Sequence, residues 1–322
     1  MLGSIAQRLG RPPIVALTAT ATPDVQRDII KQLHRKQPYR WMAELIRQNL
    51  FLEVRRTVND QLKDAAVESI LQEVDGTGII YVATIKEAER LFAEFSQRWP
   101  LALYHGKRSA REREEAQDAF MAGRAKAVVA TNAFGLGIDK PDIRFVVHYH
   151  FPGSPEAYYQ EAGRAGRDGE LSLCTILYKV EDRNVQSYFL GGKYPDIGEA
   201  ARVARIVNEI PAGQRMAIDD VAASSGVAKR KARIVLTLLK REGAVREYRG
   251  GSWERLVEDV TRVDLQHQLT DYESRREADR RKLKAMIGYC QTAQCRTRRL
   301  LEYFEEAPDP DFRCGHCDND GT

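Results

Sequence analysis

Two arginines that stand three residues apart in a glycine-rich stretch are the first candidates for chemistry. Arg164 and Arg167 lie within residues 160–169, and an apolar run follows at residues 171–178. Arginine carries a fixed fork of donors that suits phosphate oxygens, and glycine lets a backbone come close to a ligand. On a helix end, this spacing points both guanidinium groups the same way. The stretch predicts a phosphate-binding pair, with a solvated helix end closed by a glycine as the alternative.

Composition sets outer limits on what the chain is. The 322 residues suggest about two domains, and the hydrophobic content of 43% is ordinary for a globular chain. Residues 1–8 show no signal peptide and no apolar run is long enough to cross a bilayer. We therefore expect no membrane partner and a cytoplasmic location, associated with the nucleoid in a bacterium.

Positive charge is concentrated in two segments rather than spread along the chain. The net charge is only +4, but residues 229–249 hold eight basic and two acidic residues, and residues 275–299 hold nine against two. The remaining residues are therefore net acidic. Such local concentration is typical of surfaces that bind a phosphate backbone.

Four of the five cysteines form two close pairs near the end of the sequence. These are Cys290 with Cys295 and Cys314 with Cys317, with 18 residues between the pairs. In a cytoplasmic chain, two close pairs of thiols predict a structural zinc site with four cysteine ligands rather than disulfides. The fifth, Cys174, falls in an apolar run and is expected to be a core thiol.

Apolar runs alternate with amphipathic stretches between residues 61 and 178. Strands that are apolar throughout argue for a parallel sheet with both faces covered, which is an α/β fold. Before this region, an apolar strand is expected at residues 13–22 and a helix at 23–33. Within it, helices are expected at 61–74, 86–99, 110–121 and 155–162, and strands at 79–82, 101–104, 127–130, 145–149 and 173–178.

The pattern changes from α/β to helical after a linker with two glycines and a proline at residues 188–196. Helices are expected at 200–210, 219–226 and 229–241, followed by two short strands within 244–256 about Gly250 and Gly251. Three helices and a hairpin predict an α+β winged helix at residues 197–257. A basic helix at 264–287 then leads into the cysteines.

Five ordered blocks carry a family resemblance. Together they resemble motifs IV, V and VI of the second RecA-like lobe of superfamily 2 helicases, and of the RecQ family in particular. Arg47, Asn49 and Leu50 resemble the Arg-x-Asn-Leu at the start of that lobe. The blocks are residues 78–84, 104–106, 109–115, 130–142 and 160–169.

The resemblance implies four regions. Residues 13–22 resemble motif III of the first RecA-like lobe, so residues 1–46 are expected to be a remnant of that lobe. The second lobe is expected at 47–190, the winged helix at 197–257 and a small helical zinc-binding domain at 264–322. Neither Gly-x-x-x-x-Gly-Lys-Ser/Thr nor Asp-Glu-x-His occurs in the sequence. ATP and Mg²⁺ are therefore expected only together with a missing first lobe.

By the same resemblance, the paired arginines face a nucleotide. Arg167 is expected to be the arginine finger that stabilises charge on the transferred phosphoryl group, with Arg164 next to it. Gln160, Gly137 and Asp139 are expected on the nucleotide side, the last two in the loop that links the nucleotide cleft to the DNA track.

Two further residues have a structural and a functional interpretation. Thr84 ends a strand and is expected to contact a DNA phosphate, and it can equally cap the helix that follows. His105 stands in a strand-end loop, where a structural role is the preferred interpretation.

The winged helix offers the remaining DNA contacts. Its long helix starts with Lys229, Arg230 and Lys231, followed by Arg233, and in helix-turn-helix modules this helix approaches DNA. In the wing, Tyr248 and Arg249 are expected contacts, and an aromatic there can stack on a terminal base pair. A protein-binding winged helix with a solvated basic face is the alternative. Trp253 is expected to pack in the core rather than to act as a wedge.

The end of the chain is similar to the RecQ zinc-binding domain, with two departures. That family usually has one cysteine before the arginine-rich helix and three after it, whereas this sequence has Asp320 in the terminal cluster and Cys290 upstream. Cys290 is therefore expected to supply the fourth ligand, with His316 and Asp320 as alternatives, and the helix must break before Cys295. The winged helix also precedes the cysteines, whereas many relatives have the reverse order.

These patterns lead to one main functional hypothesis. The chain is expected to be the C-terminal part of a RecQ-like 3'-to-5' ATP-dependent DNA helicase of repair and recombination, inactive as an ATPase alone. Its partners are single-stranded and duplex or forked DNA, and the residues do not identify single-strand-binding or repair proteins. The alternative is a stand-alone zinc and winged-helix protein with a DNA-binding or regulatory role.

Overall fold

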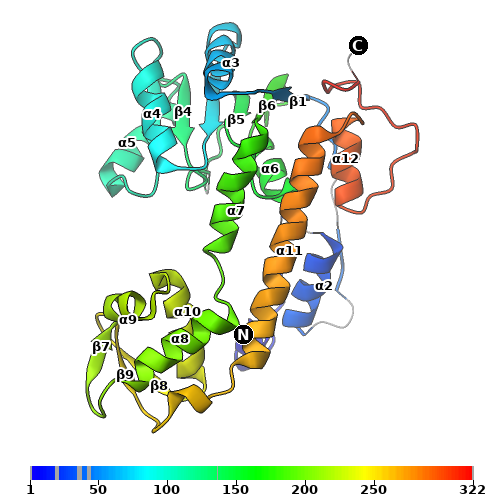
Figure 1. Cartoon of the computed structure of the whole chain (residues 1–322). Coiled ribbons are helices and arrows are strands. Elements are labelled where there is room, and N and C mark those ends of the chain that lie inside the picture. The colour runs from blue at the N-terminus through cyan, green and yellow to red at the C-terminus, as the bar shows by residue number, and fades with distance from the viewer. Residues whose placement is uncertain (1, 19–21, 35–37, 42–44, 136, 321–322) are drawn as a thin grey trace. The chain divides into compact units, whose positions relative to one another are not determined.

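The computed structural model describes residues 2–18, 22–34, 38–41, 45–135 and 137–320, and the chain divides into two compact units. The first combines Met1–Arg183 with Lys284–Thr322, and the second is Asn184–Leu283 (Figure 1). The zinc-binding domain expected at residues 264–322 is thus divided: its first twenty residues belong to the second unit, and the cysteines belong with the sheet.

Six parallel strands form the sheet of the first unit, in the order β1-β6-β5-β2-β4-β3. The central strands β2 and β4 are buried along their whole length, as a parallel sheet covered on both faces requires. This confirms the expected α/β lobe and adds one edge strand, β1, that was not expected. The strands are β1 Leu50–Arg56, β2 Thr77–Tyr81, β3 Leu101–Tyr104, β4 Ala127–Ala130, β5 Ile143–His148 and β6 Ser172–Tyr178.

Helices pack on this sheet through continuous apolar faces. Val67, Ile70 and Leu71 of α3 and Leu91 and Phe95 of α4 are buried in one core cluster with strand residues. Side-chain caps fix where several helices begin, including a reciprocal capping box between Ser109 and Glu112. The helices are α3 Asp60–Glu73, α4 Ile85–Phe95, α5 Ala110–Met121, α6 Pro155–Ala162, the short η1 Val180–Asp182 and, near the end of the chain, α12 Arg296–Tyr303.

Residues 1–46 contain two helices but no strand among their described residues. α1 spans Leu2–Arg8, and α2 spans Pro23–Gln32, close to the helix expected at 23–33. The strand expected at 13–22 is absent from residues 13–18, and residues 19–21 lie outside the described residues. Val15 and Leu17 are exposed there. A strand forms only where a neighbouring strand pairs with its backbone groups and other elements cover its side chains, and this segment has neither.

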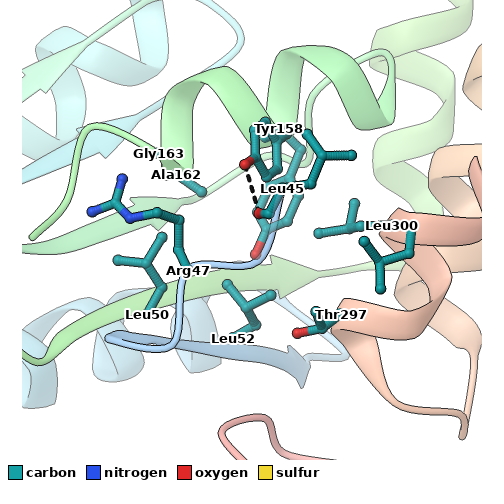
Figure 2. Close-up of a pocket in the computed structure, with 11 residues that line it drawn as sticks. Leu45, Arg47, Leu50, Leu52, Tyr158, Ala162, Gly163, Thr297 and Leu300 are labelled. Atoms are coloured by element: carbon teal, nitrogen blue, oxygen red, sulfur yellow. Dashed lines mark hydrogen bonds between the residues drawn. The ribbon is translucent and has the colours of Figure 1, made fainter. Parts of the chain in front are cut away.

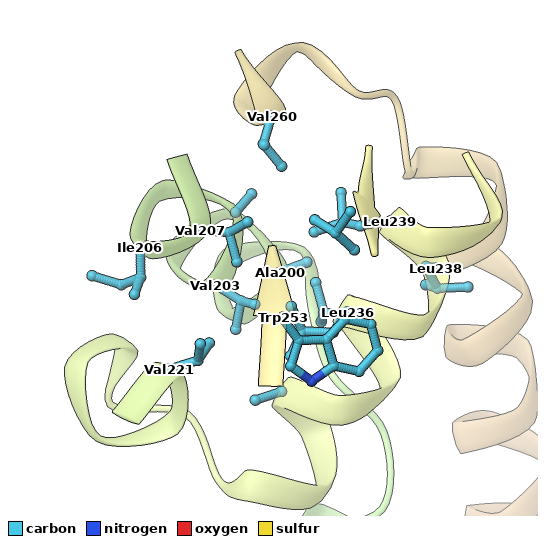
Figure 3. Packing of buried hydrophobic residues seen from close by; sticks show 14 of the residues in the cluster. Ala200, Val203, Ile206, Val207, Val221, Leu236, Leu238, Leu239, Trp253 and Val260 are labelled. Carbon is cyan, nitrogen blue, oxygen red and sulfur yellow. The ribbon is translucent and has the colours of Figure 1, made fainter. Parts of the chain in front are cut away.

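The second unit is a winged helix (Figure 3). Its core gathers apolar residues of three helices around Trp253, which is fully buried, so the core interpretation of that residue is confirmed. A third strand, β7, joins the expected hairpin in the order β7-β9-β8. The elements are α8 Ile197–Asn208, β7 Arg215–Ala217, α9 Ile218–Ser225, α10 Lys229–Arg241, β8 Val245–Tyr248, β9 Ser252–Arg255 and η2 Val260–Arg262.

Two helices join the units along the chain. α7, Arg183–Gly191, occupies part of the segment that was expected to be a linker from residue 188, and α11 spans Gln266–Gln291. Leu265 and Leu269 near the start of α11 pack on the winged-helix core. No helix in the described part of the chain has an apolar stretch that could cross a membrane.

Candidate functional site

The two arginines follow α6, in a segment that we call the arginine loop, residues 163–170. Ser154 caps α6 by accepting a hydrogen bond from the Ala157 amide, Pro155 opens its first turn, and the helix ends at Gly163. The loop lies beside the loop that follows β4, residues 131–142. Hydrogen bonds from both arginine side chains to that second loop define the candidate site.

Arg164 lies against the backbone of the β4 loop. Its Nη1 donates to the Gly135 carbonyl at 2.5 Å. Gly135 has a φ of +142°, and a Cβ there would lie 2.6 Å from the guanidinium carbon of Arg164. Only glycine therefore leaves room for this arginine. Burial raises the pKa of nearby Tyr81, which keeps its hydroxyl protonated beside Arg164. Arg164 holds the two loops together.

Arg167 is the more accessible of the two. Its Nη1 donates to the Ile138 carbonyl at 3.3 Å and to the Asp139 carboxylate at 2.5 Å. The Arg167 side chain is 36% exposed and that of Asp139 is 87% exposed. An exposed ion pair contributes only about 0–1 kcal/mol, so a phosphate can replace Asp139 as partner at little cost.

The structure brings together four of the five residues expected on the nucleotide side. Gly137, with a φ of +81°, and Asp139 share the loop that Arg164 and Arg167 contact. Gln160 is exposed on α6. Among the described residues it makes no hydrogen bond to that loop.

Thr84 and His105 lie at the ends of β2 and β3. The Thr84 hydroxyl accepts a hydrogen bond from the Glu87 amide at 3.2 Å, which confirms its role as a cap of α4; a DNA contact stays a prediction. His105 is 2% exposed with its Nε2 3.5 Å from Glu89, in keeping with the structural interpretation.

A second candidate site lies at the end of the chain, where three cysteines and one aspartate converge. The ligand atoms of Cys295, Cys314, Cys317 and Asp320 all lie within 4.8 Å of one another. Tetrahedral zinc with Zn–S distances of about 2.3 Å sets its ligand atoms roughly 3.8 Å apart, so this group needs only a small contraction to hold the ion. We call residues 314–320 the metal knuckle.

Backbone amides already face the sulfur atoms of this group. The Arg296 amide points at Cys317 Sγ and the His316 amide at Cys314 Sγ, each at 3.4 Å. The Cys314 amide donates to Asp320 Oδ2 at 2.7 Å. Amide donors stabilise negative charge on a ligand, so the donor set fits a dication bound by thiolates and a carboxylate.

Cys290 is not in this group, contrary to the sequence expectation. It lies in the last turn of α11, which ends at Gln291, whereas Cys295 caps the start of α12. The helix does break between them, as expected, but the break leaves Cys290 in the core, where burial raises the pKa of its thiol. Asp320 takes the place expected for Cys290.

Some of the residues expected to contact DNA in the winged helix are paired with carboxylates, and others are exposed. Lys231 is engaged by the Glu199 carboxylate at 2.8 Å, and Lys229 pairs with Asp219 at 2.6 Å. Arg230, Arg233 and Arg249 are exposed. Tyr248 is not a free stacking surface, because Arg215 lies 3.5 Å from its ring centroid and its hydroxyl donates to Glu254.

Sequence reasoning missed or undervalued three residues that the structure places at these sites. Asn49 and Arg47 donate hydrogen bonds to carbonyls of the arginine loop, and Asp318 joins the metal knuckle to β1. The signal for the first two was the Arg-x-Asn-Leu resemblance, and for the third it was only a position beside a cysteine.

The parallel lobe, the contacts of its arginine loop with the β4 loop and the group of cysteines together resemble the second RecA-like lobe of superfamily 2 helicases with a metal-binding segment. Residues 61–169 match the family described as Helicase conserved C-terminal domain, and residues 255–320 match RecQ zinc-binding. Both matches support the resemblance to the C-terminal portion of RecQ-family helicases.

Curated relatives share this resemblance. The probable ATP-dependent DNA helicase RecS of Bacillus subtilis is 30% identical over 98% of this chain and 61% of its own length. The ATP-dependent DNA helicase RecQ of the same organism is 32% identical over 95% of this chain and 39% of its length. Rat ATP-dependent DNA helicase Q5 is 40% identical over 59% of this chain and 21% of its length. The chain therefore spans less than two thirds of each of these relatives.

Proposed function

We propose that this chain is the part of an ATP-dependent DNA helicase that supplies the arginine finger, a DNA-binding surface and a zinc site. The observation that carries the proposal is the pair of arginine contacts to the β4 loop, in which the only carboxylate given for Arg167 among the described residues is the exposed one of Asp139. The relatives RecS and RecQ of Bacillus subtilis are named as ATP-dependent DNA helicases, the first as a probable one, which supports the proposal. Movement in the 3'-to-5' direction, a role in repair and recombination, and a cytoplasmic location stay predictions.

The arginines have separate roles in this proposal. Arg167 exchanges Asp139 for oxygens of the transferred phosphoryl group and stabilises the charge that develops on it. Arg164 keeps its contact to the Gly135 carbonyl and holds the arginine loop against the β4 loop. ATP and Mg²⁺ are bound together with a first RecA-like lobe, which carries the phosphate loop and the carboxylates that this sequence lacks.

Zn²⁺ is the proposed metal at the knuckle, with Cys295, Cys314, Cys317 and Asp320 as ligands. Four protein ligands leave no open position, so the ion is structural. When bound, it supplies no chemistry beyond holding the two ends of the knuckle together. Asp320 and the three sulfurs provide the negative charge that the ion requires.

The alternative is a zinc and winged-helix protein that binds DNA without catalysis. The two proposals share the DNA-binding surface and the zinc site, so DNA binding alone does not separate them. They differ over the arginine loop, because a protein without catalysis has no use for Arg167.

The test joins this chain behind the first RecA-like lobe of a RecQ-family relative and measures ATP hydrolysis with and without single-stranded DNA. We expect the chain alone to bind DNA in a salt-sensitive manner without stimulated hydrolysis, and the joined protein to hydrolyse ATP. Arg167→Ala should then lower the stimulated rate by about 10³-fold or more, as loss of an arginine finger does.

The matched control is Arg124→Ala, which removes an exposed arginine of the same unit outside the five blocks of the resemblance. It should leave the rate unchanged. DNA binding with no hydrolysis in the joined protein would support the non-catalytic alternative. Stimulated hydrolysis by the unjoined chain would show that the first lobe is not required.

A further inference from the structure

Two side chains just before β1 hold the arginine loop by its carbonyl groups. Arg47 Nη2 donates to the Gly166 carbonyl at 2.7 Å and to that of Ala165 at 3.3 Å. Asn49 Nδ2 donates to the Gly166 carbonyl at 2.7 Å and to that of Glu170 at 2.9 Å. These four hydrogen bonds connect residues more than a hundred positions apart in the sequence. They fix the backbone of the loop both before and after Arg167.

The backbone conformation of Gly166 and its lack of a side chain allow these hydrogen bonds. Its φ is +55°, and a Cβ there would lie 2.4 Å from Asn49 Nδ2 and 2.7 Å from the Glu170 carbonyl. The glycine between the two arginines therefore admits the Asn49 side chain. The neighbouring residue, Gln48, is exposed and makes no hydrogen bond to the arginine loop among the described residues.

The strand that follows these residues is itself held by the metal knuckle. β1 is an edge strand, paired with β6 on one side. On its other side the Leu52 amide donates to the His316 carbonyl at 3.2 Å, and the Asp318 amide donates to the Leu52 carbonyl at 3.0 Å. Leu52 and Cys317 thus form a parallel bridge, so a proposed zinc ligand sits in the added strand segment.

Side chains extend this pairing along β1. The Val54 amide donates to Asp318 Oδ2 at 2.8 Å, and His316 Nδ1 lies 2.8 Å from the Leu50 carbonyl. A carbonyl only accepts, so His316 carries its proton on Nδ1. Asp318 also receives two hydrogen bonds from buried Arg296, at 2.7 and 2.9 Å. The knuckle therefore occupies the Leu50 carbonyl, both backbone groups of Leu52 and the Val54 amide.

Apolar packing makes the same junction rigid. Leu50 and Leu52 of β1, Tyr158 and Ala162 of α6, and Leu300 of α12 surround a cavity of only about 30 Å³ (Figure 2). Movement of β1 against α6 and α12 would therefore break apolar contacts on this face as well as the hydrogen bonds to the knuckle. α6 leads directly into the arginine loop.

We propose that Arg47 and Asn49 are positioning residues for Arg167, and that the metal-bound knuckle fixes the strand from which they act. The metal thereby controls the order of the arginine loop through β1. This inference rests on the proposed zinc ligands and on Arg167 as the finger. Without the metal, residues 316–318 are no longer held in place, and β1 loses the hydrogen bonds on its outer edge. The backbone at Arg47 and Asn49, just before β1, then becomes less ordered, and their side chains no longer hold the arginine loop.

Hydrogen exchange of the full chain, resolved to single amides, tests this without any catalytic assay. With zinc bound, the amides of Leu52, Val54, Gly166 and Ser172 should be protected; the last donates to the Asn49 carbonyl. Removal of zinc by a chelator should speed their exchange by about tenfold or more, while amides of β2 and β4 stay unchanged. Fast exchange at Leu52 and Val54 with unchanged exchange at Gly166 would overturn the coupling.

Asn49→Ala separates the second step from the first. With zinc bound, it should speed exchange at Gly166 and Ser172 and leave Leu52, Val54 and the zinc content unchanged. Gln48→Ala is the matched control and should change none of them. Unchanged exchange at Gly166 in Asn49→Ala, with β2 and β4 protected and the chain folded, would show that Asn49 does not position the loop. Neither result depends on whether the joined protein hydrolyses ATP.

Discussion

Asp320 shows how one residue changes the character of a site. Its side chain is only 1% exposed, and it lies three residues after Cys317, the spacing that separates Cys317 from Cys314. An aspartate at this point offers oxygen in place of sulfur, and its bond to zinc is about 2.0–2.2 Å long rather than about 2.3 Å. The proposed centre therefore has three thiolates and one carboxylate.

Cobalt substitution tests this ligand set. Co²⁺ bound at the knuckle should show sulfur-to-cobalt charge transfer from three thiolates, and Asp320→Cys should raise that absorbance by about a third, because a fourth thiolate joins the site. Titration of the metal-free chain with Co²⁺, followed by absorbance, makes the measurement. Cys290→Ala should leave the spectrum unchanged. A loss of absorbance in Cys290→Ala would return Cys290 to the ligand set.

The residues that bind could be partly read from the sequence, and those that support them could not. Arg164, Arg167 and Asp139 were expected together because their motifs resemble a family, and the structure joins them. Asp318 had no such signal, since its partners Val54 and Arg296 are distant in sequence. Cys290 was expected to be a ligand because it forms a close pair with Cys295 in the sequence, but it lies on α11 and its side chain is buried in the core.

At the scale of elements, buried strands and capped helices were predictable and the edges were not. β3, β4, α5, α6 and α10 match their expected bounds, because apolar patterns mark the two strands and α10, and side-chain caps mark α5 and α6. β1 was missed because only its alternate residues are buried. Its sequence therefore lacks the continuous apolar run that marks the central strands. The strand expected at residues 13–22 has the right composition, but a strand forms only against a partner.

One ion pair shows how an element is held by more than its apolar face. Lys63 of α3 is fully buried, with its Nζ donating to the Tyr149 carbonyl at 2.6 Å and to the Asp182 carboxylate of η1. Burial lowers the pKa of Lys63 and raises that of Asp182, so each side chain depends on the other for its charge. The pair fixes η1 against α3 at a cost in desolvation.

Removal of one partner should therefore cost more than removal of both. Lys63→Met leaves Asp182 buried without its cation, and we expect the free energy of unfolding of the first unit to fall by about 3–5 kcal/mol. Lys63→Met with Asp182→Leu should recover most of that loss. Urea unfolding of both variants and of the exposed control Lys107→Met makes the comparison. Equal losses in the single and double variants would show that the pair is not coupled.

At the scale of the molecule, the basic segment of the winged helix and the proposed metal site lie in different units. The first unit holds the arginine loop and the metal knuckle, and the basic segment at residues 229–249 lies in the second. Within that segment, neighbouring acidic groups already occupy Lys229 and Lys231. The charge that remains available to a phosphate backbone is therefore smaller than the sequence count suggests. Arg230 and Arg233 on α10 and Arg249 in the wing are among the exposed residues that carry it.

The salt dependence of DNA binding measures this free charge. Each phosphate contact contributes about 0.9 to the slope of log affinity against log salt, so Arg230→Ala with Arg233→Ala should reduce the magnitude of that slope by about 2. Lys231→Ala is the matched control on the same helix: it removes one charge that Glu199 already neutralises, so the slope should change by much less than 0.9. The measurement is affinity for single-stranded and duplex DNA at several salt concentrations, with the full chain.

If all three substitutions change the slope in proportion to the charge removed, the basic segment acts through its total charge and the exposed arginines have no special role. If the double variant leaves the slope unchanged, the winged helix does not carry the DNA contacts, and the protein-binding interpretation of this unit becomes the better one.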